Sequence, residues 1–578
     1  MYLPPVVREI TRVAAEHPDA IAVTDGVRSV SYAELLQLAR QVTATLVEGG
    51  VGEAQVAAFP GVRSIGSIVT MMGILGAGAG YIAVDANSSE RSKMIFGEVG
   101  VSAIATGLST AGSAEGWEFV PGRGKRWGEA RAHPAYAIFT SGSTGKPKGI
   151  LVSHDSLAWH ARAIRIAYEL EPGDRVLHCS SLLFDVAIEE IWPTLAAGAT
   201  VVVLPEPLGN LSYDRATALL SDLGISVCNI PSSYFAGWVE HLRTSPLPSS
   251  LRLVVVGSEP LPGSAARAWL GLEQSAGRRL VNAYGLSEAT VTSLIYEVQA
   301  DGGEDACVPV GRPLPGIDVL IVDKSGNPVS KGVTGELWLA GEGLSMGYTD
   351  AIADGGKFVT RRDSGSPRRW LRTGDLARWD GAEISVCGRT DDQVKIAGHR
   401  IEPAELLAAL LNLEQVRDAR ILHLDGELVA FLVGRQQSYQ DVLGSLARVL
   451  PSYMFPTTIK WLAEYPTTSG GKVDLAALGA IYYEVAARRD LTVDGLAEVW
   501  TSVLEVPDVK FSDDFFDLGG NSLAAARVIS ALRRRWDAQC TLADVFSSPR
   551  LEDFVELLVS RGQMVGDSTG LREVEKVP

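Results

Sequence analysis

FTSGSTGKPKG, at residues 139–149, is the stretch that most restricts the fold, and it follows the apolar run AYAIF. Consecutive Gly, Ser and Thr let a backbone curl around an anion, so that N–H groups and hydroxyls face phosphate oxygens. Lys146 and Lys148 add positive charge, and Pro147 distinguishes the stretch from a Walker loop, whose lysine precedes Ser or Thr. Composition alone would also fit a flexible surface loop. We expect a phosphate-binding loop between a strand and a helix-like segment that begins ILVSHDSL.

Short apolar runs surround this loop and alternate with helical patterns up to about residue 390. TVVVLP, LRLVVVG, DVLIVD and GELWLAG are such runs, and HDSLAWHARAIRIAYEL has helical spacing. This alternation is typical of an α/β domain. Beyond it, a helix with Pro403 in its first turn precedes ARILHL, an Asp-Gly turn and ELVAFLVG, which predicts a small α+β domain.

Composition excludes several classes of function. The 578-residue chain has a net charge of -17, which disfavours nucleic-acid binding. Its five cysteines are far apart and form no CxxC pair, so neither a disulfide framework nor a zinc module is expected. Charges near the start replace the apolar stretch of a signal peptide, which favours the cytoplasm. Residues 64–84 carry no charge, but their Gly and Ala content predicts a buried helix, a turn and a buried strand rather than a membrane span.

FTSGSTGKPKG resembles the signature loop of the acyl-adenylating superfamily, and in particular of the adenylation domains of nonribosomal peptide synthetases. DDFFDLGGNSL at 513–523 resembles a peptidyl carrier domain. Other motifs resemble the adenylation family and come in its order: SYAEL at 31–35, NAYGLSEAT at 282–290, GELWLAGEGLSMGY at 335–348, RTGDL at 372–376, GRTDDQVKIAGHRIE at 388–402 and PTTSGGKVD at 466–474.

The resemblance implies a multidomain chain, with a large α/β N-terminal adenylation core, a small α+β C-terminal subdomain and an all-α, four-helix carrier domain. The expected boundaries are 1–390 for the core, 391–478 for the mobile subdomain, 479–493 for a linker, 494–562 for the carrier and 563–578 for a flexible tail.

The resemblance also assigns an ATP site. Tyr284 offers a ring on which adenine stacks, Asp375 accepts both ribose hydroxyls, and Arg389 reaches the ribose or the phosphates. Glu288 supplies an oxygen to Mg²⁺. The residues expected to contact ATP are Thr140, Ser141, Gly142, Ser143, Thr144, Gly145, Lys148, Tyr284, Ser287, Asp375 and Arg389.

Three residues of the small subdomain have catalytic roles by resemblance. Lys472 bridges the substrate carboxylate and the nucleotide during adenylation. Asp391 is the hinge about which the subdomain then rotates, which brings Lys395 to the side where the thioester forms. In the carrier, Ser522 holds 4′-phosphopantetheine, although a serine before the helical pattern LAAARVISALRRRW is also a favoured helix cap.

The substrate pocket follows by position. Asp185 corresponds to the aspartate that binds an α-ammonium, so the substrate is expected to be an α-amino acid. Glu189 is costly in such a pocket unless a cation pairs with it, which predicts lysine, ornithine, diaminobutyrate or an arginine relative. The alternative is that Glu189 turns outward beside Glu190 and that the substrate is small and aliphatic, such as valine. The expected pocket residues are Phe184, Asp185, Val186, Glu189, Asn229, Val254, Val256, Ala283, Val291 and Thr292.

The resulting hypothesis is a ligase that uses ATP and Mg²⁺ to form an aminoacyl-adenylate and then loads the amino acid on the phosphopantetheine of Ser522. Expected partners are a phosphopantetheinyl transferase, a downstream condensation or tailoring enzyme and an MbtH-like activator, with no nucleic acid and no membrane. The rival hypotheses are an acyl-CoA synthetase relative, against which Asp185 and the carrier sequence argue, and a non-catalytic carrier scaffold. The chain contains no HHxxxDG motif, so peptide-bond formation is expected to occur on partner proteins or not at all.

Overall fold

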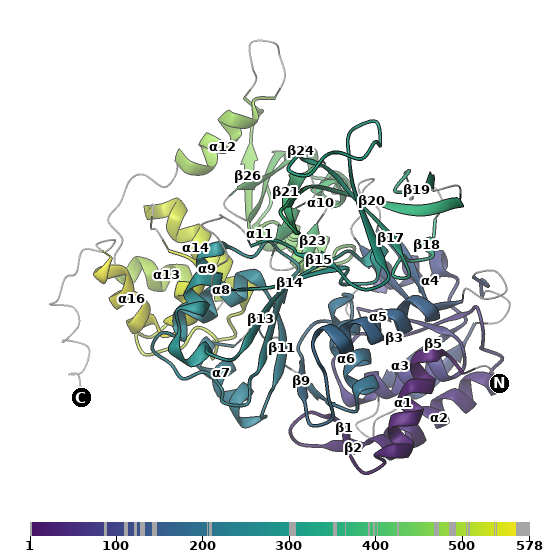
Figure 1. The fold of residues 1–578 in the computed structure, drawn as a ribbon. Coiled ribbons are helices and arrows are strands. Elements are labelled where there is room, and N and C mark those ends of the chain that lie inside the picture. The colour runs from purple at the N-terminus through teal and green to yellow at the C-terminus, as the bar shows by residue number, and fades with distance from the viewer. Residues whose placement is uncertain are drawn as a thin grey trace.

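A computed structural model gives the fold (Figure 1). It describes residues 3–85, 89–108, 114–120, 124–127, 133–140, 147–204, 206, 208, 211–299, 308–350, 355–363, 366–390, 394–396, 399–401, 403–424, 427–466, 473–484, 493–504, 506, 509–536, 538 and 540–561. None of the helices formed by these residues combines the length and the apolar character that a bilayer crossing requires.

The first sheet of the core has the strand order β15-β14-β13-β12-β11-β9-β10-β1-β2. Its central strands pair in parallel, as expected for a sheet covered by helices on both faces. The strands are β1 (Ile21–Thr24), β2 (Ser29–Ser31), β9 (Arg175–His178), β10 (Thr200–Val203), β11 (Val227–Pro231), β12 (Leu253–Gly257), β13 (Arg279–Tyr284), β14 (Leu294–Glu297) and β15 (Arg312–Pro313).

The second sheet has the order β18-β8-β7-β4-β3-β5-β6. The run ILVS lies in strand β8 and pairs antiparallel with β7, so the expectation that it starts a helix is wrong, and the helix begins at His154. The strands are β3 (Val56–Pro60), β4 (Gly80–Val84), β5 (Ala103–Leu108), β6 (Ala114–Phe119), β7 (Pro134–Thr140), β8 (Lys148–Ser153) and β18 (Gly347–Tyr348).

A third, antiparallel sheet completes the core, in the order β16-β17-β20-β19 with β21 paired to β20. Its strands are β16 (Ile317–Val322), β17 (Gly335–Gly341), β19 (Phe358–Asp363), β20 (Ser366–Asp380) and β21 (Glu383–Arg389). The core helices are α1 (Pro5–Glu16), α2 (Tyr32–Glu48), α3 (Ile65–Gly76), α4 (Ser89–Val99), α5 (His154–Ala167), α6 (Val186–Ala197), α7 (Tyr213–Asp222), α8 (Ser232–His241) and α9 (Gly263–Leu270), with 3-10 turns η2 (Glu273–Ser275) and η3 (Ser287–Ala289).

The uncharged stretch at residues 64–84 folds as its composition predicts. Helix α3 is buried along its whole length, and after a turn at 77–79 the chain enters the buried strand β4. The Ser64 hydroxyl caps the helix by accepting a hydrogen bond from the Ser67 N–H. The helix has no charged residue and is buried on every side, as expected for a helix that packs inside the core.

The small subdomain pairs β24 with β25 antiparallel and β25 with β26 in parallel, and a separate hairpin joins β22 to β23. Helix α12 continues to Glu484, and its Leu478 and Tyr482 pack on Val429 and Phe431, so the packed subdomain extends beyond its expected end at 478. The elements are β22 (Val394–Ile396), β23 (His399–Ile401), α10 (Pro403–Leu411), β24 (Val416–Leu424), β25 (Glu427–Gly434), α11 (Tyr439–Leu446), η5 (Ser452–Met454), β26 (Thr458–Leu462) and α12 (Leu475–Glu484).

The carrier domain is all-α, as expected. Trp500, Phe515 and Phe554 meet in its centre, with ring centroids 5.0 Å apart for Trp500 and Phe515 and 6.3 Å apart for Trp500 and Phe554. Its helices in the described residues are α13 (Val493–Leu504), α14 (Ser522–Trp536), α15 (Leu542–Ser547) and α16 (Leu551–Ser560).

Candidate active site

Asp185 stands at the start of helix α6, where the loop after β9 enters the helix. The Ser287 hydroxyl donates a hydrogen bond of 2.5 Å to Asp185 Oδ2, so this hydroxyl, expected on phosphate, is turned toward the carboxylate. Burial raises the pKa of the Asp185 carboxyl, the Ser287 hydrogen bond opposes that effect, and the Glu288 and Glu189 carboxylates add to it. A cation beside Asp185 would remove the cost of this charge.

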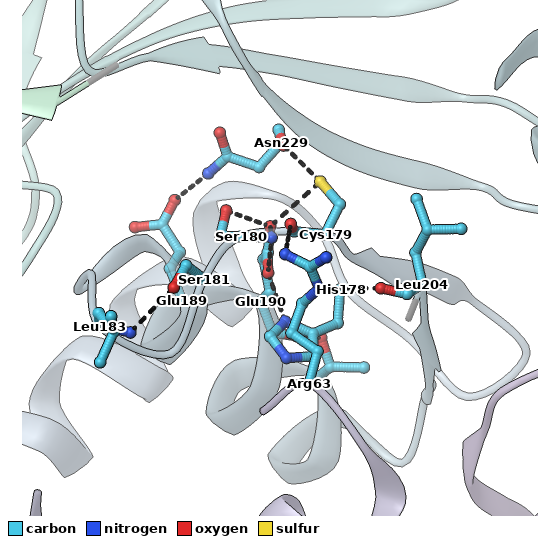
Figure 2. Close-up of polar contacts among 11 residues, drawn as sticks. Arg63, His178, Cys179, Ser180, Ser181, Leu183, Glu189, Glu190, Leu204 and Asn229 are labelled. Atoms are coloured by element: carbon cyan, nitrogen blue, oxygen red, sulfur yellow. Dashed lines mark hydrogen bonds and ion pairs between the residues drawn. The ribbon is translucent and has the colours of Figure 1, made fainter. Parts of the chain in front are cut away.

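Glu190 holds, through hydrogen bonds, the loop that leads to Asp185 (Figure 2). Its carboxylate accepts hydrogen bonds from the backbone N–H of Ser180, at 3.2 Å to each oxygen, and from the Ser180 hydroxyl at 2.7 Å. His178 Nδ1 lies 2.6 Å from its Oε2. Glu190 is 1% exposed, so these contacts replace the water that a buried carboxylate lacks. Glu190 is therefore a positioning residue for the loop.

Glu189 points inward, in contrast to the alternative in which it faces outward. It is 3% exposed, and its Oε1 accepts hydrogen bonds from the Tyr168 hydroxyl at 2.7 Å and from Asn229 Nδ2 at 3.1 Å (Figure 2 shows the Asn229 contact). His160 Nε2 lies 3.3 Å from Oε2. Among the described residues, neither Oε2 nor either ring nitrogen of the fully buried His160 has a hydrogen-bond partner. One oxygen of this carboxylate is thus satisfied and the other is not.

The expected wall residues Val254 and Val256 lie on the wrong face of strand β12. In the parallel register Asn229 stands opposite Val255, whereas Val254 and Val256 stand opposite Cys228 and Ile230 and pack toward α7–α9. Neighbours in register share a face and successive residues alternate, so the residues beside Asn229 are Val255 and Gly257. Strand LVVVG is apolar on both faces, and its pattern therefore gives no sign of which face is which.

Gly257 also leaves room beside the next strand. A Cβ at this position would lie 3.0 Å from the Ala283 carbonyl oxygen and 3.6 Å from its Cβ. Ala283 is the expected wall residue of β13 and is partly exposed. We therefore replace Val254 and Val256 in the expected pocket by Val255 and Gly257.

The segment between Tyr284 and Thr292 is held in a strained backbone. Thr290 and Val291 have φ values of 56° and 66°, which are unusual for β-branched residues. A Cβ on Gly285 would lie 1.6 Å from the Val291 carbonyl oxygen, so only glycine allows this close return of the chain. The fold thereby brings Thr292, which is 5% exposed, back toward the start of the segment.

The residues expected on the nucleotide side meet at one place. The Tyr284 hydroxyl donates a hydrogen bond of 2.5 Å to Asp375 Oδ2, and the Arg389 guanidinium pairs with Asp375 Oδ1. Asp375 and Arg389 face each other in the β20–β21 register. Burial, followed by the Asp375 carboxylate, raises the pKa of the Tyr284 phenol well above its ordinary value, so the phenol stays a donor.

Glu288 lies on η3, four residues after Tyr284 in the chain, and is 3% exposed. The Tyr348 hydroxyl donates a hydrogen bond of 2.7 Å to its Oε1. Among the described residues, no three His, Cys, Asp or Glu side chains gather as a protein-only metal site would require. A single carboxylate suits Mg²⁺ that is also held by nucleotide phosphates and water, so the donor set fits Mg·ATP.

Several expected site residues fall outside the described residues or have side chains that are not described. Thr140 and Lys148 are described and pair with each other at the end of the β7–β8 hairpin, on either side of the expected phosphate loop. Lys395 lies in β22, and its side chain is not described. The residues outside the described ranges are Ser141, Gly142, Ser143, Thr144, Gly145, Asp391 and Lys472.

Ser522 is the first residue of helix α14, and the hydrogen bonds of the preceding Asn521 make that residue the cap of the helix. The Ala524 N–H donates a hydrogen bond of 2.9 Å to Asn521 Oδ1, and the Ala525 N–H donates one of 2.7 Å to the Asn521 carbonyl oxygen. The capping role that would explain a serine here is therefore filled by its neighbour. This arrangement fits a serine that is kept for modification.

The carrier domain lies against the core. Phe546 of α15 stacks on Tyr213 of α7, with ring centroids 5.2 Å apart, and meets Tyr234 of α8 edge-on at 6.0 Å. A Cβ on Gly237 of α8 would lie 2.9 Å from Ala543 Cβ, so the two helices nearly touch there. Figure 1 shows the carrier helices beside α7, α8 and α9. Phe546 is 4% exposed and is buried by this contact and by Phe516.

Sequence reasoning missed Tyr168, His160 and Glu190 as parts of the site. Tyr168 and His160 belong to the α5 segment, whose helical pattern looks like ordinary core. Only the tertiary fold brings them to Glu189. For Glu190, the acid pair in the apolar run VAIEEIW was a usable signal, because a helix buried all round leaves neither carboxylate in water.

Comparison with known proteins identifies the family of the chain. The AMP-binding enzyme family model matches residues 10–349, and the model for the phosphopantetheine attachment site matches residues 494–558. Syringomycin synthase SyrB1 of Pseudomonas syringae pv. syringae is 34% identical over 90% of both chains. The probable non-canonical nonribosomal peptide synthetase CymA of Salinispora arenicola (strain CNS-205) is 32% identical over 96% of this chain, which spans 7% of that protein. Isonitrile lipopeptide synthase of Streptomyces coeruleorubidus is 32% identical over 97% of this chain, which spans 40% of that protein.

A solved structure has the same domain composition. The holo form of PA1221, an NRPS protein containing adenylation and PCP domains and bound to a vinylsulfonamide inhibitor, has a TM-score of 0.74 and 28% identity, with 98% of both chains covered. The chain therefore belongs to the AMP-binding enzyme family, as a ligase that joins a nonribosomal peptide synthetase adenylation domain, which uses ATP and Mg²⁺, to a carrier domain for 4′-phosphopantetheine.

Proposed function

We propose that the chain activates one α-amino acid and loads it on its own carrier domain. In the first step a carboxylate oxygen of the amino acid attacks the α-phosphorus of ATP, which forms the aminoacyl-adenylate and releases pyrophosphate. In the second step the amino acid moves to the carrier and AMP is released. When attached to Ser522, phosphopantetheine supplies the thiol that accepts the acyl group.

The chain's residues divide the work of the first step. Asp185, held by Ser287 and by the loop that Glu190 clamps, binds the α-ammonium. Tyr284, Asp375 and Arg389 bind the nucleoside, and Glu288 binds Mg²⁺. We further propose that Lys472 bridges the reacting carboxylate and the nucleotide. Rotation about Asp391 then brings Lys395 toward the site.

The observation that bears most on the substrate is the unpartnered Oε2 of Glu189. A buried carboxylate oxygen without a hydrogen bond is costly, and a cation from the substrate removes that cost. The pKa of Asp185 is raised partly by Glu189, so the two acids repel each other while no cation is bound. We therefore propose a substrate with two ammonium groups, of the ornithine, lysine or diaminobutyrate class, or an arginine relative.

A neutral substrate is the second candidate, and one observation favours it. His160 Nε2, 3.3 Å from Glu189 Oε2, neutralises the carboxylate if the ring is protonated. Glu189 would then serve the protein alone, and valine or another small amino acid would fit between Val255, Gly257 and Ala283.

Pyrophosphate exchange into ATP separates the two substrates. The Glu189→Gln variant keeps an acceptor for Tyr168 and Asn229 but loses the charge. If the substrate pairs with Glu189, the ratio of kcat/KM for ornithine to that for norvaline falls by about 30-fold or more, the equivalent of about 2 kcal/mol or more for a lost buried charge partner. An unchanged ratio would contradict the pairing. His160→Gln serves as the control, because it removes the imidazole beside Oε2 and leaves the carboxylate.

Loading depends on the contact between α15 and α8. In the Ala543→Arg variant the larger side chain has no space beside Gly237, so the carrier can no longer pack against the core at this contact. We expect the rate of loading to fall by about tenfold or more while pyrophosphate exchange is unchanged. Ser547→Arg, a change to the same residue at an exposed position of the same helix, is the matched control. Equal loading by both variants would show that this contact is not used.

A carrier domain needs a phosphopantetheinyl transferase and an amino acid substrate. We propose in addition that the loaded amino acid passes to a downstream condensation or tailoring enzyme in the cytoplasm, and that an MbtH-like protein assists the core. If the chain were a non-catalytic scaffold, no amino acid would support exchange even with such a protein present.

A further inference from the structure

A buried ion pair joins the core to the small subdomain. Arg91 of α4 donates a hydrogen bond of 2.9 Å from Nη1 to Glu405 Oε1 of α10, and the two side chains are 8% and 2% exposed. Arg91 Nη1 also lies 3.3 Å from the Val449 carbonyl oxygen of the small subdomain. Both charges are covered by the contact between the two subdomains, and neither pair partner lies in the sites described above.

A second contact lies beside this pair and reaches the amino acid site. Tyr453 of η5 meets Phe184 edge-on, with ring centroids 5.1 Å apart, and Phe184 precedes Asp185 in the chain. Burial raises the pKa of the Tyr453 phenol to about 12, the Arg91 charge opposes this rise, and the Glu405 and Asp85 charges add to it. The position of the small subdomain is thereby linked to the segment that holds the substrate.

An ion pair of this kind specifies an arrangement more than it adds stability. Bringing two charges out of water costs about as much as their attraction returns, but separating one partner while the other stays buried is strongly unfavourable. If the small subdomain rotates, both side chains return to water together. The pair therefore penalises partial or shifted arrangements and favours the one in which both partners meet.

The carrier is seated on α7 and α8 in this same arrangement, through Phe546 and Tyr213. Since the carrier is needed only in the second step, we propose that the Arg91–Glu405 pair holds the small subdomain in the arrangement used to load the carrier, so that it controls loading and not adenylation. This inference rests on the proposed function and names a pair of positioning residues for its second step.

The test measures the two steps separately in the full chain. Pyrophosphate exchange is measured on the form without phosphopantetheine, and single-turnover loading is measured on the modified form by acid quench. For Glu405→Gln and for Arg91→Gln we expect loading to slow by about tenfold or more and exchange to stay within about twofold of the unaltered chain. The charge-swapped double variant, Arg91→Glu with Glu405→Arg, is expected to recover most of the loading rate.

Two further variants, a control elsewhere in the core and a conservative change of Arg91, decide the test even if the charge-swapped double variant does not fold. Arg252→Gln breaks the Arg252–Asp174 pair inside the core, where the guanidinium Nη2 lies 2.6 Å from Asp174 Oδ2, and is expected to alter both steps alike. Arg91→Lys keeps the charge and is expected to load faster than Arg91→Gln. Thermal unfolding of each variant shows whether a lower rate reflects lost structure.

The outcomes separate this inference from the function on which it rests. If Glu405→Gln slows both steps equally, slows exchange alone or changes neither, the pair does not select the loading arrangement. Absence of exchange in the unaltered chain with any amino acid, even with an MbtH-like protein present, would overturn the proposed function and this inference with it. If the unaltered chain shows normal exchange but Glu405→Gln does not slow loading selectively, only this inference would be overturned.

Discussion

The Ser522→Ala variant is expected to form the aminoacyl-adenylate at the rate of the unaltered chain and to load no amino acid. The first step uses residues of the core around Asp185, Tyr284 and Asp375, whereas Ser522 lies in the carrier domain. Alanine favours a helix at this position, and Asn521 continues to cap α14, so the carrier keeps its fold.

Two measurements check this expectation. Pyrophosphate exchange reports the first step, and the mass of the intact chain after treatment with a phosphopantetheinyl transferase reports attachment of the arm. The matched control is Ser560→Ala, a change at an exposed serine of α16 in the same domain. A stable acyl-enzyme formed by Ser522→Ala would show that another residue accepts the amino acid.

The Asp185→Asn variant is expected to lose amino acid activation and to gain stability. The amide cannot pair with the α-ammonium, and loss of a buried charge partner costs about 3–5 kcal/mol, so kcat/KM for exchange falls by about a hundredfold or more. The variant keeps an acceptor for the Ser287 hydroxyl. Exchange kinetics over a range of amino acid concentrations check this loss.

The gain in stability follows from the pKa of Asp185. Its pKa in the folded chain is raised above the ordinary value of 3.8, chiefly by burial, so the folded state binds its proton more tightly than the unfolded state. Folding stability therefore falls as the pH rises from 3.8 through the raised pKa, and the full cost is present above it. The neutral amide of the Asp185→Asn variant would carry no such cost at neutral pH.

Thermal unfolding at several pH values tests this sign. We expect Asp185→Asn to unfold at a higher temperature than the unaltered chain at neutral pH, and the difference to shrink as the pH approaches 3.8. Ser287→Ala, which removes the hydroxyl that stabilises the charged carboxylate, is expected to shift stability in the opposite direction at neutral pH. A less stable Asp185→Asn protein would contradict the assignment of a costly charge at this position.

Local sequence signals predict the elements well where one periodicity or one turn dominates. The runs ARILHL and ELVAFLVG pair antiparallel in β24 and β25, with Leu424 opposite Glu427, and the Asp-Gly turn predicted between them lies outside the described residues. Pro403 begins α10 as a proline in a first turn does. The prediction for ILVS is wrong because a short apolar run before a helical pattern fits both a strand and a helix start, and its pairing with β7 decides for the strand.

The site is harder to predict because its parts meet across the fold. The pairing of β12 with β11 decides that Val255, and not Val254, shares a sheet face with Asn229. The sequence of an all-apolar strand does not reveal this pairing. The inward direction of Glu189 depends on Tyr168, which follows α5, and on Asn229 of β11. Arg91 and Glu405 are 314 residues apart, and nothing near either of them predicts the pair.

The central claim is that one chain both activates an amino acid and holds it on its own carrier domain. The most direct measurement is the mass of the intact, phosphopantetheine-modified chain after incubation with ATP, Mg²⁺ and a mixture of the standard amino acids, ornithine and diaminobutyrate. We expect a gain equal to one aminoacyl group, located on the peptide that contains Ser522 and absent without ATP. An unchanged mass in the presence of every amino acid and of an MbtH-like protein, with the arm attached and the protein folded, would contradict the claim.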